Sequence, residues 1–313
     1  MNSPFKVVFM GTPDFAVPSL NALKEFGCTV SLVVTQPDKP KGRGRKLTPP
    51  PVKTAALAND FSVMQPDSVK TQEFYERIAA LTPDLLVVVA FGHVLPENIL
   101  AVPKLGAINV HASLLPKYRG PAPIQWAIIN GDAETGITTM RMDKGLDTGD
   151  ILKTAKIRIS RQDTAATLHD RLALLGADVL LETLKDLRDG SLKSVPQDHA
   201  LATDAPLLTK SHGRIDWSQS AGAIERFIRG MTPWPGAYTF REDKRLKIFR
   251  AEIRQEHPNA RPGQVIAGIP GQLWVAAGDG ILSILEIQGS SGKRLPIEDF
   301  LRGFPVPVGT VFT

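Results

Sequence analysis

The sequence predicts an α/β protein: a doubly wound, mostly parallel sheet over residues 1–190, then a small C-terminal β-barrel of the OB-like type. Two observations support this prediction. Short apolar runs alternate with helical patterns in the first 190 residues, and strands separated by helices are typical of βαβ units. After residue 206 the pattern changes to five short strand candidates, which favours a small barrel.

The first strands of the predicted sheet are continuous apolar runs. Lys6–Met10, Thr29–Val34 and Leu85–Ala90 are rich in valine and leucine, as expected for strands buried on both faces. Ala107–Val110 is a shorter run of the same kind. Sheets of this type bind ligands at the carboxyl ends of their strands, so we expect the functional site there.

Helices and two later strands complete this domain. Asp14–Phe26 has apolar residues at helical spacing, with Asp14 as the candidate N-cap. Ile137–Met142 and Ile151–Ile159 are predicted strands. Asp163–Arg188 has the leucine spacing of a long amphipathic helix.

Residues 191–206 show little apolar periodicity, so we expect a linker between the domains 1–190 and 207–313. Trp217 and Trp234 are predicted to anchor the packing of the domain rather than to stack on bases. The strand candidates beyond the linker are Ala237–Arg241, Leu246–Ile253, Gln264–Ile269, Leu273–Ala277 and Ile281–Gln288.

The composition excludes several classes of protein. The 313 residues carry a formal net charge of +5, which permits a polyanionic partner without requiring one. Apolar runs such as Leu85–Phe91 are too short to span a bilayer, and no secretory signal is visible. The single cysteine, Cys28, excludes an intramolecular disulfide and a cysteine-rich zinc site, so we expect a reducing cytoplasm.

Common cofactor and metal motifs are missing from the sequence. Gly11-Thr12-Pro13 stands where a dinucleotide-binding chain would carry GxGxxG, and the phosphate-binding pattern GxxxxGK[ST] is absent. The six histidines include no pair at HxxxH spacing, so we expect no metal site.

The densest polar motif is Gly106–Gly120, GAINVHASLLPKYRG. Asn109 and His111 are two residues apart at the end of a predicted strand, so their side chains point to the same face. An imidazole can move a proton and a carboxamide can hold a developing oxyanion, as acyl transfer to an amine requires. A lone histidine is more often structural, but the Ser-Leu-Leu-Pro loop and an acidic candidate downstream favour a functional one.

That acidic candidate lies in Lys144–Asp150, KGLDTGD, a glycine-rich loop between predicted strands. Asp147 or Asp150 could hold the tautomer of His111, as the acid of a catalytic triad does. Ordinary Asx turns are the alternative explanation for both aspartates. Spacing alone does not choose between the two.

These motifs together resemble the 10-formyltetrahydrofolate-dependent formyltransferase family, in residues, spacing and sheet context. The resemblance implies that Asn109, His111 and Asp147 are catalytic. It also implies a site for the formyl donor, 10-formyltetrahydrofolate, lined by a loop of Ser113, Leu114, Leu115 and Pro116.

A basic loop indicates a polyanionic partner. Residues 39–46, KPKGRGRK, hold five positive charges and no acid. Glycines make such a loop mobile until a partner orders it, and arginines bind phosphates and stack on bases. A solvated charged loop is the alternative.

Longer segments extend the resemblance over nearly the whole chain: FMGTPDFAVPSL, TQPDKPKGRGRKLTPPPVK, GPAPIQWAIINGDAETGIT, RIDW and PWPGAY. They are similar to the branch of the family whose acceptor is initiator methionyl-tRNA. This implies that the basic loop contacts the tRNA acceptor end, that the barrel binds the rest of the acceptor arm, and that contacts come from Arg43, Lys41, Arg45 and Lys46. Leu207 departs from the branch, which is expected to have a lysine there.

We therefore expect a monomeric enzyme that formylates the α-amine of methionine on initiator tRNA for translation initiation. One alternative keeps the chemistry but takes a small amine, such as an amino sugar, and it leaves the basic loop without a role. Another alternative is a non-catalytic RNA-binding protein, which leaves Asn109 and His111 unexplained.

Overall fold

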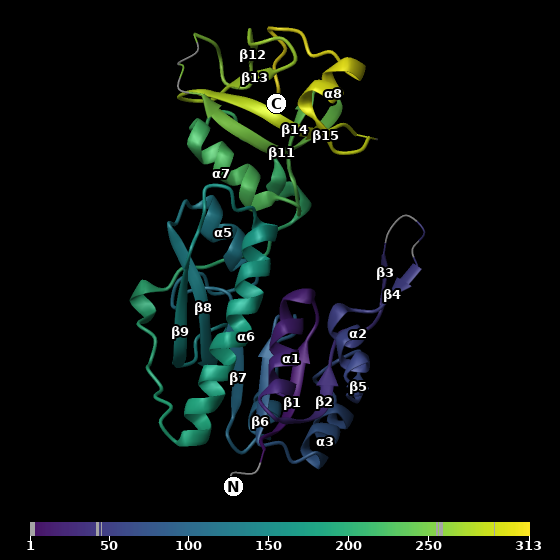
Figure 1. Cartoon of the computed structure of the whole chain (residues 1–313), viewed down its shortest axis with the longest axis vertical. Coiled ribbons are helices and arrows are strands. Elements are labelled where there is room, and N and C mark those ends of the chain that lie inside the picture. The colour runs from purple at the N-terminus through teal and green to yellow at the C-terminus, as the bar shows by residue number, and fades with distance from the viewer. Residues whose placement is uncertain (1–3, 42–43, 45, 255, 257–258, 291) are drawn as a thin grey trace. The chain divides into compact units, whose positions relative to one another are not determined.

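The computed structural model describes residues 4–41, 44, 46–254, 256, 259–290 and 292–313 (Figure 1). Contacts divide the chain into two compact units. The N-terminal unit comprises Met1–Pro123, Glu134–Arg158 and His169–Pro206. The C-terminal unit comprises Ile124–Ala133, Ile159–Leu168 and Leu207–Thr313. Each unit therefore combines separate segments, whereas the sequence predicts continuous domains, and residues 191–206 pack with the N-terminal unit.

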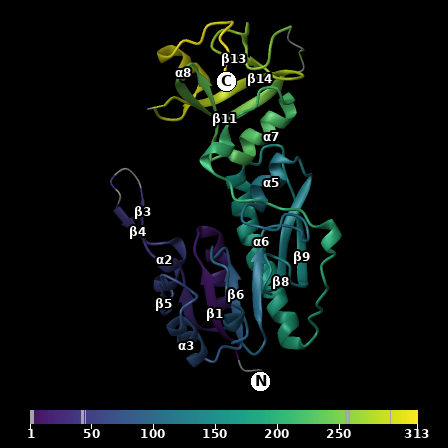
Figure 2. The ribbon, with the colours of Figure 1, turned by 180° about the vertical axis from the view of Figure 1, so that it is seen from behind.

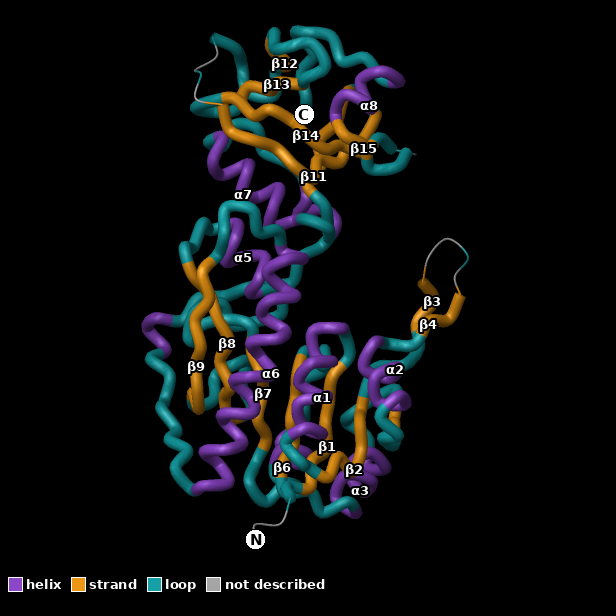
Figure 3. The backbone as a smooth tube through the Cα atoms, viewed as in Figure 1, coloured by secondary structure: helices purple, strands orange, loops and turns teal. Residues whose placement is uncertain are grey.

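A seven-stranded sheet forms the centre of the N-terminal unit (Figure 3). Its strand order is β5-β2-β1-β6-β7-β8-β9. The first five strands in this order are parallel, β8 is antiparallel to β7, and β9 is antiparallel to β8. The predicted mostly parallel sheet is confirmed. The strands are β1 (Lys6–Gly11), β2 (Thr29–Val34), β5 (Val63–Met64), β6 (Leu85–Val89), β7 (Ala107–His111), β8 (Glu134–Arg141) and β9 (Ile151–Arg158).

Helices cover both faces of this sheet, so all five residues of the central strand β6 are buried. On one face, Phe74 and Ile78 of α3 pack with Val8, Val88 and other strand residues. Helices α1 and α6 lie on the opposite face (Figures 1 and 2). The helices of the N-terminal unit are α1 (Val17–Glu25, after the 3-10 turn Asp14–Ala16), α2 (Pro51–Ala58), α3 (Gln72–Ala80), α4 (Glu97–Leu100) and, from His169 onward, α6 (Ala165–Asp189).

A two-stranded ribbon, which the sequence does not predict, includes both ends of the basic loop. Strand β3 (Lys39–Lys41) pairs with β4 (Lys46–Thr48) in antiparallel register, and Lys41 lies opposite Lys46. Arg43 and Arg45 lie outside the described residues. The ribbon therefore brings the two ends of the basic loop side by side.

The C-terminal unit contains a six-stranded antiparallel sheet in the order β10-β11-β14-β13-β12, with β15 on β14. Strands β10 and β14 have the predicted bounds, while Gly268 and Pro270 end β12 early. The strands are β10 (Ala237–Arg241), β11 (Lys244–Arg254), β12 (Val265–Ile266), β13 (Leu273–Ala276), β14 (Ile281–Gln288) and β15 (Leu295–Pro296). Helices α7 (Ala221–Met231) and α8 (Ile297–Gly303) belong to the same unit, as does α5 (Pro123–Ile129) from Ile124 onward.

The last residues of the chain close this sheet into a barrel. The Thr313 amide donates to Phe240 O in β10 at 3.0 Å, and the Phe240 amide donates back to Thr313 O at 2.8 Å. On the other side, the Val265 amide in β12 donates to Thr310 O at 2.7 Å. One short segment thus joins the two edge strands, and the predicted small barrel is confirmed. Within the described residues, no helix is long and apolar enough to cross a membrane.

Candidate active site

Asn109 and His111 lie at the carboxyl end of β7, on the same face of the strand. Both side chains face Asp147 from the loop between β8 and β9. Asn109 Nδ2 donates to Asp147 Oδ1 at 3.5 Å, and His111 Nδ1 lies 3.6 Å from Asp147 Oδ2. His111 is buried. We call Asn109, His111 and Asp147 the polar cluster.

Asp147 is held in an unusual backbone conformation. Its φ of 54° lies in the left-handed region, which residues with a side chain seldom occupy, although aspartate tolerates it better than most. The Gly120 amide donates to Asp147 Oδ2 at 2.8 Å. Asp150, the other candidate from the sequence, instead accepts from Ser194 Oγ at 2.6 Å. The structure therefore brings Asp147, and not Asp150, next to His111.

The tautomer of His111 is set by a backbone carbonyl rather than by an aspartate. His111 Nε2 lies 2.9 Å from Tyr118 O. Because a carbonyl oxygen can only accept, Nε2 carries the hydrogen and Nδ1 is the nitrogen left to take up a proton. Nδ1 is also the nitrogen that faces Asp147. The carboxylate is thus placed to stabilise the charged ring, and Tyr118 O orients the ring.

The loop predicted to bind the donor is tied to the neighbouring strand. Ser113 Oγ donates to Lys117 O at 2.6 Å. Thr138 Oγ1, in β8, donates to Ser113 O at 2.7 Å and accepts from the Leu115 amide at 3.1 Å. Ser113 and Leu115 are buried, whereas Leu114 and Pro116 are partly exposed. Leu114 and Pro116 are therefore the members of the loop with surface left to offer a ligand.

Two residues that support this site were missed by the sequence reasoning. Thr138 lies opposite His111 in the β7–β8 register, so its role becomes visible only once the strands are paired. Gln197 lies in the expected linker and is buried. Its Nε2 donates to Asp147 O at 2.9 Å and to Gly149 O at 2.7 Å. A polar residue in a polar segment carries no sequence signal for such a contact.

The predicted tRNA-binding residues are exposed where they can be described. Lys46 is exposed in β4. The backbone of Lys41 lies in β3, while Arg43 and Arg45 lie outside the described residues. The roles of all four residues stay predictions.

Three cations gather beside β10 in the C-terminal unit: Lys210, Arg245 and Lys247, which we call the cation cluster. Lys247 lies opposite Tyr238 in the β10–β11 register, and the Arg245 guanidinium lies 3.7 Å from the centre of the Tyr238 ring. Burial, and then the charges of Arg245 and Lys210, lower the pKa of Lys247. Three like charges therefore face one another.

The cation cluster has no anionic partner among the residues that the structure describes. None of the ion pairs found in the described part of this unit includes Lys210, Arg245 or Lys247. Arg245 Nε is buried without a hydrogen-bond partner. Like charges without compensation cost stability, so they are typical of a site that binds an external anion.

The two tryptophans that the sequence analysis names, Trp217 and Trp234, differ. Trp217 is buried and donates from Nε1 to Thr239 Oγ1 at 3.0 Å, as expected of a packing residue. Trp234 is 50% exposed, so only part of its surface is packed.

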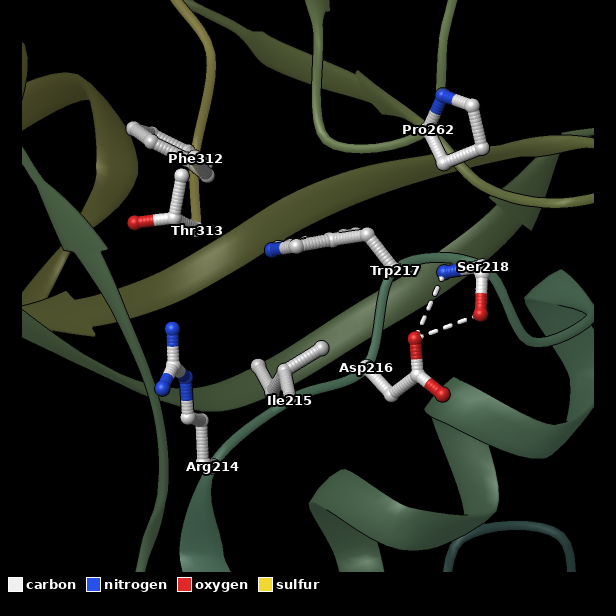
Figure 4. A pocket seen from close by; sticks show the side chains of 8 residues that line it. All are labelled: Arg214, Ile215, Asp216, Trp217, Ser218, Pro262, Phe312 and Thr313. Atoms are coloured by element: carbon white, nitrogen blue, oxygen red, sulfur yellow. Dashed lines mark hydrogen bonds between the residues drawn. The ribbon is translucent and has the colours of Figure 1, made fainter.

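A pocket of about 480 Å³ opens beside Trp217, lined by Arg214, Ile215, Asp216, Ser218, Pro262, Phe312 and Thr313 (Figure 4). Asp216 Oδ1 accepts from the Ser218 amide at 3.0 Å and from Ser218 Oγ at 2.6 Å. These bonds lower the pKa of Asp216. The acid is thus satisfied by its own turn, and none of the polar cluster lines this pocket.

Comparison with known sequences identifies the family. The sequence model described as formyl transferase matches residues 5–184, and that described as formyl transferase, C-terminal domain, matches residues 207–305. A methionyl-tRNA formyltransferase of Caldanaerobacter subterraneus subsp. tengcongensis is 53% identical over 98% of this chain and 99% of its own. One of Desulfotalea psychrophila is 51% identical over 98% of this chain and 95% of its own.

Solved structures share the fold at low sequence identity. HypX from Aquifex aeolicus in complex with tetrahydrofolic acid has a TM-score of 0.66 at 19% identity, over 98% of this chain and 48% of that one. WlaRD, a sugar 3N-formyl transferase, has a TM-score of 0.67 at 19% identity, over 93% of this chain and 100% of that one. The chain thus belongs to the formyl transferase family, in the group of methionyl-tRNA formyltransferases.

Proposed function

We propose that this enzyme transfers a formyl group from 10-formyltetrahydrofolate to the α-amine of methionine esterified to initiator tRNA. The observation that carries the proposal is the polar cluster, in which a carboxamide, an imidazole and a carboxylate meet at the carboxyl end of β7. The name shared by the relatives gives the transferred group, formyl, and the acceptor, methionyl-tRNA.

The chemistry is an acyl transfer. The methionyl amine, whose ordinary pKa is about 8 at most, has a neutral fraction at pH 7 that can attack the formyl carbon. A new C–N bond forms, the tetrahedral oxyanion collapses, and the bond from the formyl carbon to N10 of the folate breaks. The proton lost by the amine is returned to N10, so the products are formylmethionyl-tRNA and tetrahydrofolate.

Each member of the polar cluster has one part in this scheme. Asn109 holds the oxyanion through its amide hydrogens. His111 accepts the amine proton at Nδ1, because Nε2 already donates to Tyr118 O, and then passes the proton to the leaving nitrogen. Asp147 stabilises the imidazolium between these two transfers. Leu114 and Pro116 offer the partly exposed surface for the folate.

Charge supports the assignment of the acceptor. The β3–β4 ribbon carries Lys46 exposed at one end of the basic loop, and the cation cluster holds three positive charges without an anionic partner among the described residues. Phosphates of a tRNA supply the missing anions. We place the reaction in the cytoplasm, where translation is initiated, and propose that a single chain carries it out.

The direct test is formyl transfer from 10-formyltetrahydrofolate to charged initiator tRNA, with free methionine and charged elongator tRNA in parallel. The proposal expects transfer to the initiator tRNA far above transfer to the other two. Transfer to amino sugars, with none to charged tRNA, would support the small-amine alternative instead.

A further inference from the structure

Residues 191–206, which we call the strap, lie along the catalytic face of the N-terminal unit. The strap is mostly exposed; of these sixteen residues, all of them described, only Gln197 and Ala205 are buried. A buried glutamine in an exposed segment is unusual, because burial of a carboxamide is costly unless its hydrogen bonds are made. The bonds that Gln197 makes therefore indicate its role.

The carboxamide of Gln197 joins two loops of the polar cluster. Its Nε2 donates to the carbonyls of Asp147 and Gly149 at 2.9 and 2.7 Å. Its Oε1 accepts from Nε and Nη2 of Arg119, at 3.1 and 2.7 Å. One side chain thus bridges the loop that carries Asp147 and the loop whose next residue, Gly120, donates to the Asp147 carboxylate.

Backbone contacts of the strap fix the second loop independently. The Arg119 amide donates to Thr203 O at 2.8 Å, and the Ala205 amide donates to Arg119 O at 2.7 Å. Gly120 packs so closely on the strap that an added Cβ would lie 2.8 Å from Ala205 O. The strap therefore holds residues 119–120, and Gln197 ties the Asp147 loop to them.

The left-handed backbone conformation of Asp147 explains why the bond from Gln197 matters. A φ of 54° is uncommon for a residue with a side chain, although aspartate adopts it more readily than most, so the bonds of Asp147 help to keep it there. Besides the 3.5 Å bond from Asn109, Asp147 accepts two shorter bonds, one on its carboxylate from Gly120 and one on its carbonyl from Gln197. Without the second bond, the carboxylate could move away from His111, which it already approaches only to 3.6 Å.

We propose that Gln197 is a positioning residue for formyl transfer, which holds Asp147 at the distance from Asn109 and His111 that the reaction needs. The proposal rests on the formyl transfer proposed above. Gln197 contacts no reacting atom and acts only through Asp147. Its removal should therefore affect the rate of the chemical step more than the binding of either substrate.

The test compares Gln197→Ala and Gln197→Glu with the wild type in the formylation of charged initiator tRNA. Gln197→Glu keeps an acceptor for Arg119 but has no donor for the two carbonyls, so it separates the two sets of bonds and keeps the size of the side chain. Both variants should lower kcat at least about tenfold, since a shift of about 1 Å costs up to 10²-fold, while KM for each substrate changes less than about threefold. Ser194→Ala, which removes a strap bond to Asp150 instead, should keep the wild-type kcat.

A double-mutant cycle separates positioning from a merely structural role. In an Asp147→Asn background, Gln197→Ala should change kcat by less than about twofold, because the group that it positions is already disabled. Full additivity in this cycle, or a wild-type kcat for both single variants, would overturn the inference while the proposed function stands. An inactive wild-type enzyme would overturn the proposed function first, and the inference with it.

Discussion

The polar cluster and the cation cluster are built in opposite ways. In the polar cluster, oppositely charged or complementary groups face one another, and backbone groups fix two of them: Tyr118 O contacts His111, and the Gly120 amide donates to Asp147. In the cation cluster, like charges face one another and Arg245 Nε is left without a partner. The chemistry proposed for the polar cluster depends on the positions of its groups to within about an ångström. Anion binding by the cation cluster depends on the total positive charge and tolerates movement of the side chains.

Under the proposed function, this contrast implies a division of work between the two units. A reaction that moves one proton between two nitrogens needs fixed distances, so its residues lie on a strand end and in braced loops. A large polyanion is bound through many phosphates, and none of them has to be held at an exact distance. Lysine and arginine on a sheet face are therefore sufficient to bind it. Variants of the two clusters should therefore change different kinetic constants.

The largest effect is expected from the polar cluster. Asp147→Asn and His111→Ala should each lower the rate of single-turnover formylation by about 10² or more, because the proton transfer loses its acceptor or the charge that stabilises it. Asp150→Asn, which alters the neighbouring aspartate away from His111, is the matched control and should retain activity. An unchanged rate for His111→Ala would remove it from the mechanism.

The cation cluster should act on tRNA binding. Arg245→Ala combined with Lys247→Ala should raise KM for charged tRNA about tenfold, and the slope of log K against log salt should flatten by about 1 for each phosphate that the variant no longer neutralises. Lys70→Ala, which removes an exposed lysine elsewhere, should leave both quantities unchanged. A fall in kcat with an unaltered salt slope would contradict this role.

Variants in the basic loop should each have a smaller effect on the use of tRNA. Arg43→Ala and Lys46→Ala should weaken the use of tRNA by about three- to tenfold, with Arg43 the larger, because arginine pairs with phosphate bidentately. Titration of the formylation rate against salt is the measurement. Rates that match the wild type at every salt concentration would count against the basic loop as a tRNA contact.

The smallest expected effect is on stability. The folded-state pKa of Lys247 is lowered by burial and by its neighbours, so the unfolded chain binds more protons below the ordinary lysine pKa and stability rises with pH there. Lys247→Met should therefore raise Tm at pH 7 by about 1–3 °C, a gain that shrinks as the pH approaches about 10. Lys293→Met, at an exposed lysine outside the cation cluster, should show no such gain. A lower Tm for Lys247→Met at pH 7 would contradict the account of unrelieved repulsion.

The fold was predictable wherever the signal is local. Runs such as Thr29–Val34 and Ile281–Gln288 have the bounds that their apolar residues predict, because burial on a sheet requires such residues in sequence. The two-residue strand β5 and the ribbon β3–β4 escaped prediction, since their hydrogen bonds depend on partners rather than on their own residues. The closing of the barrel by residues 310–313 also depends on partner strands, so the sequence did not predict it.

The candidate site was predictable where side-chain chemistry marks it. Asn109, His111 and the two aspartates stand out by residue type, and the structure then brings Asp147 to His111. Tyr118 acts through its carbonyl, which every residue has, so no residue type marks it. Gln197 lies fifty residues from Asp147 in the chain, and only the fold brings the two together.

Single-turnover formylation at saturating charged initiator tRNA tests the division of work most directly. Here the Arg245→Ala, Lys247→Ala double variant should reach the wild-type rate once its weaker binding is overcome, while Asp147→Asn should remain at least about 10² slower at any tRNA concentration. An equal reduction of the rate in both variants at saturation would contradict the separation of chemistry from binding.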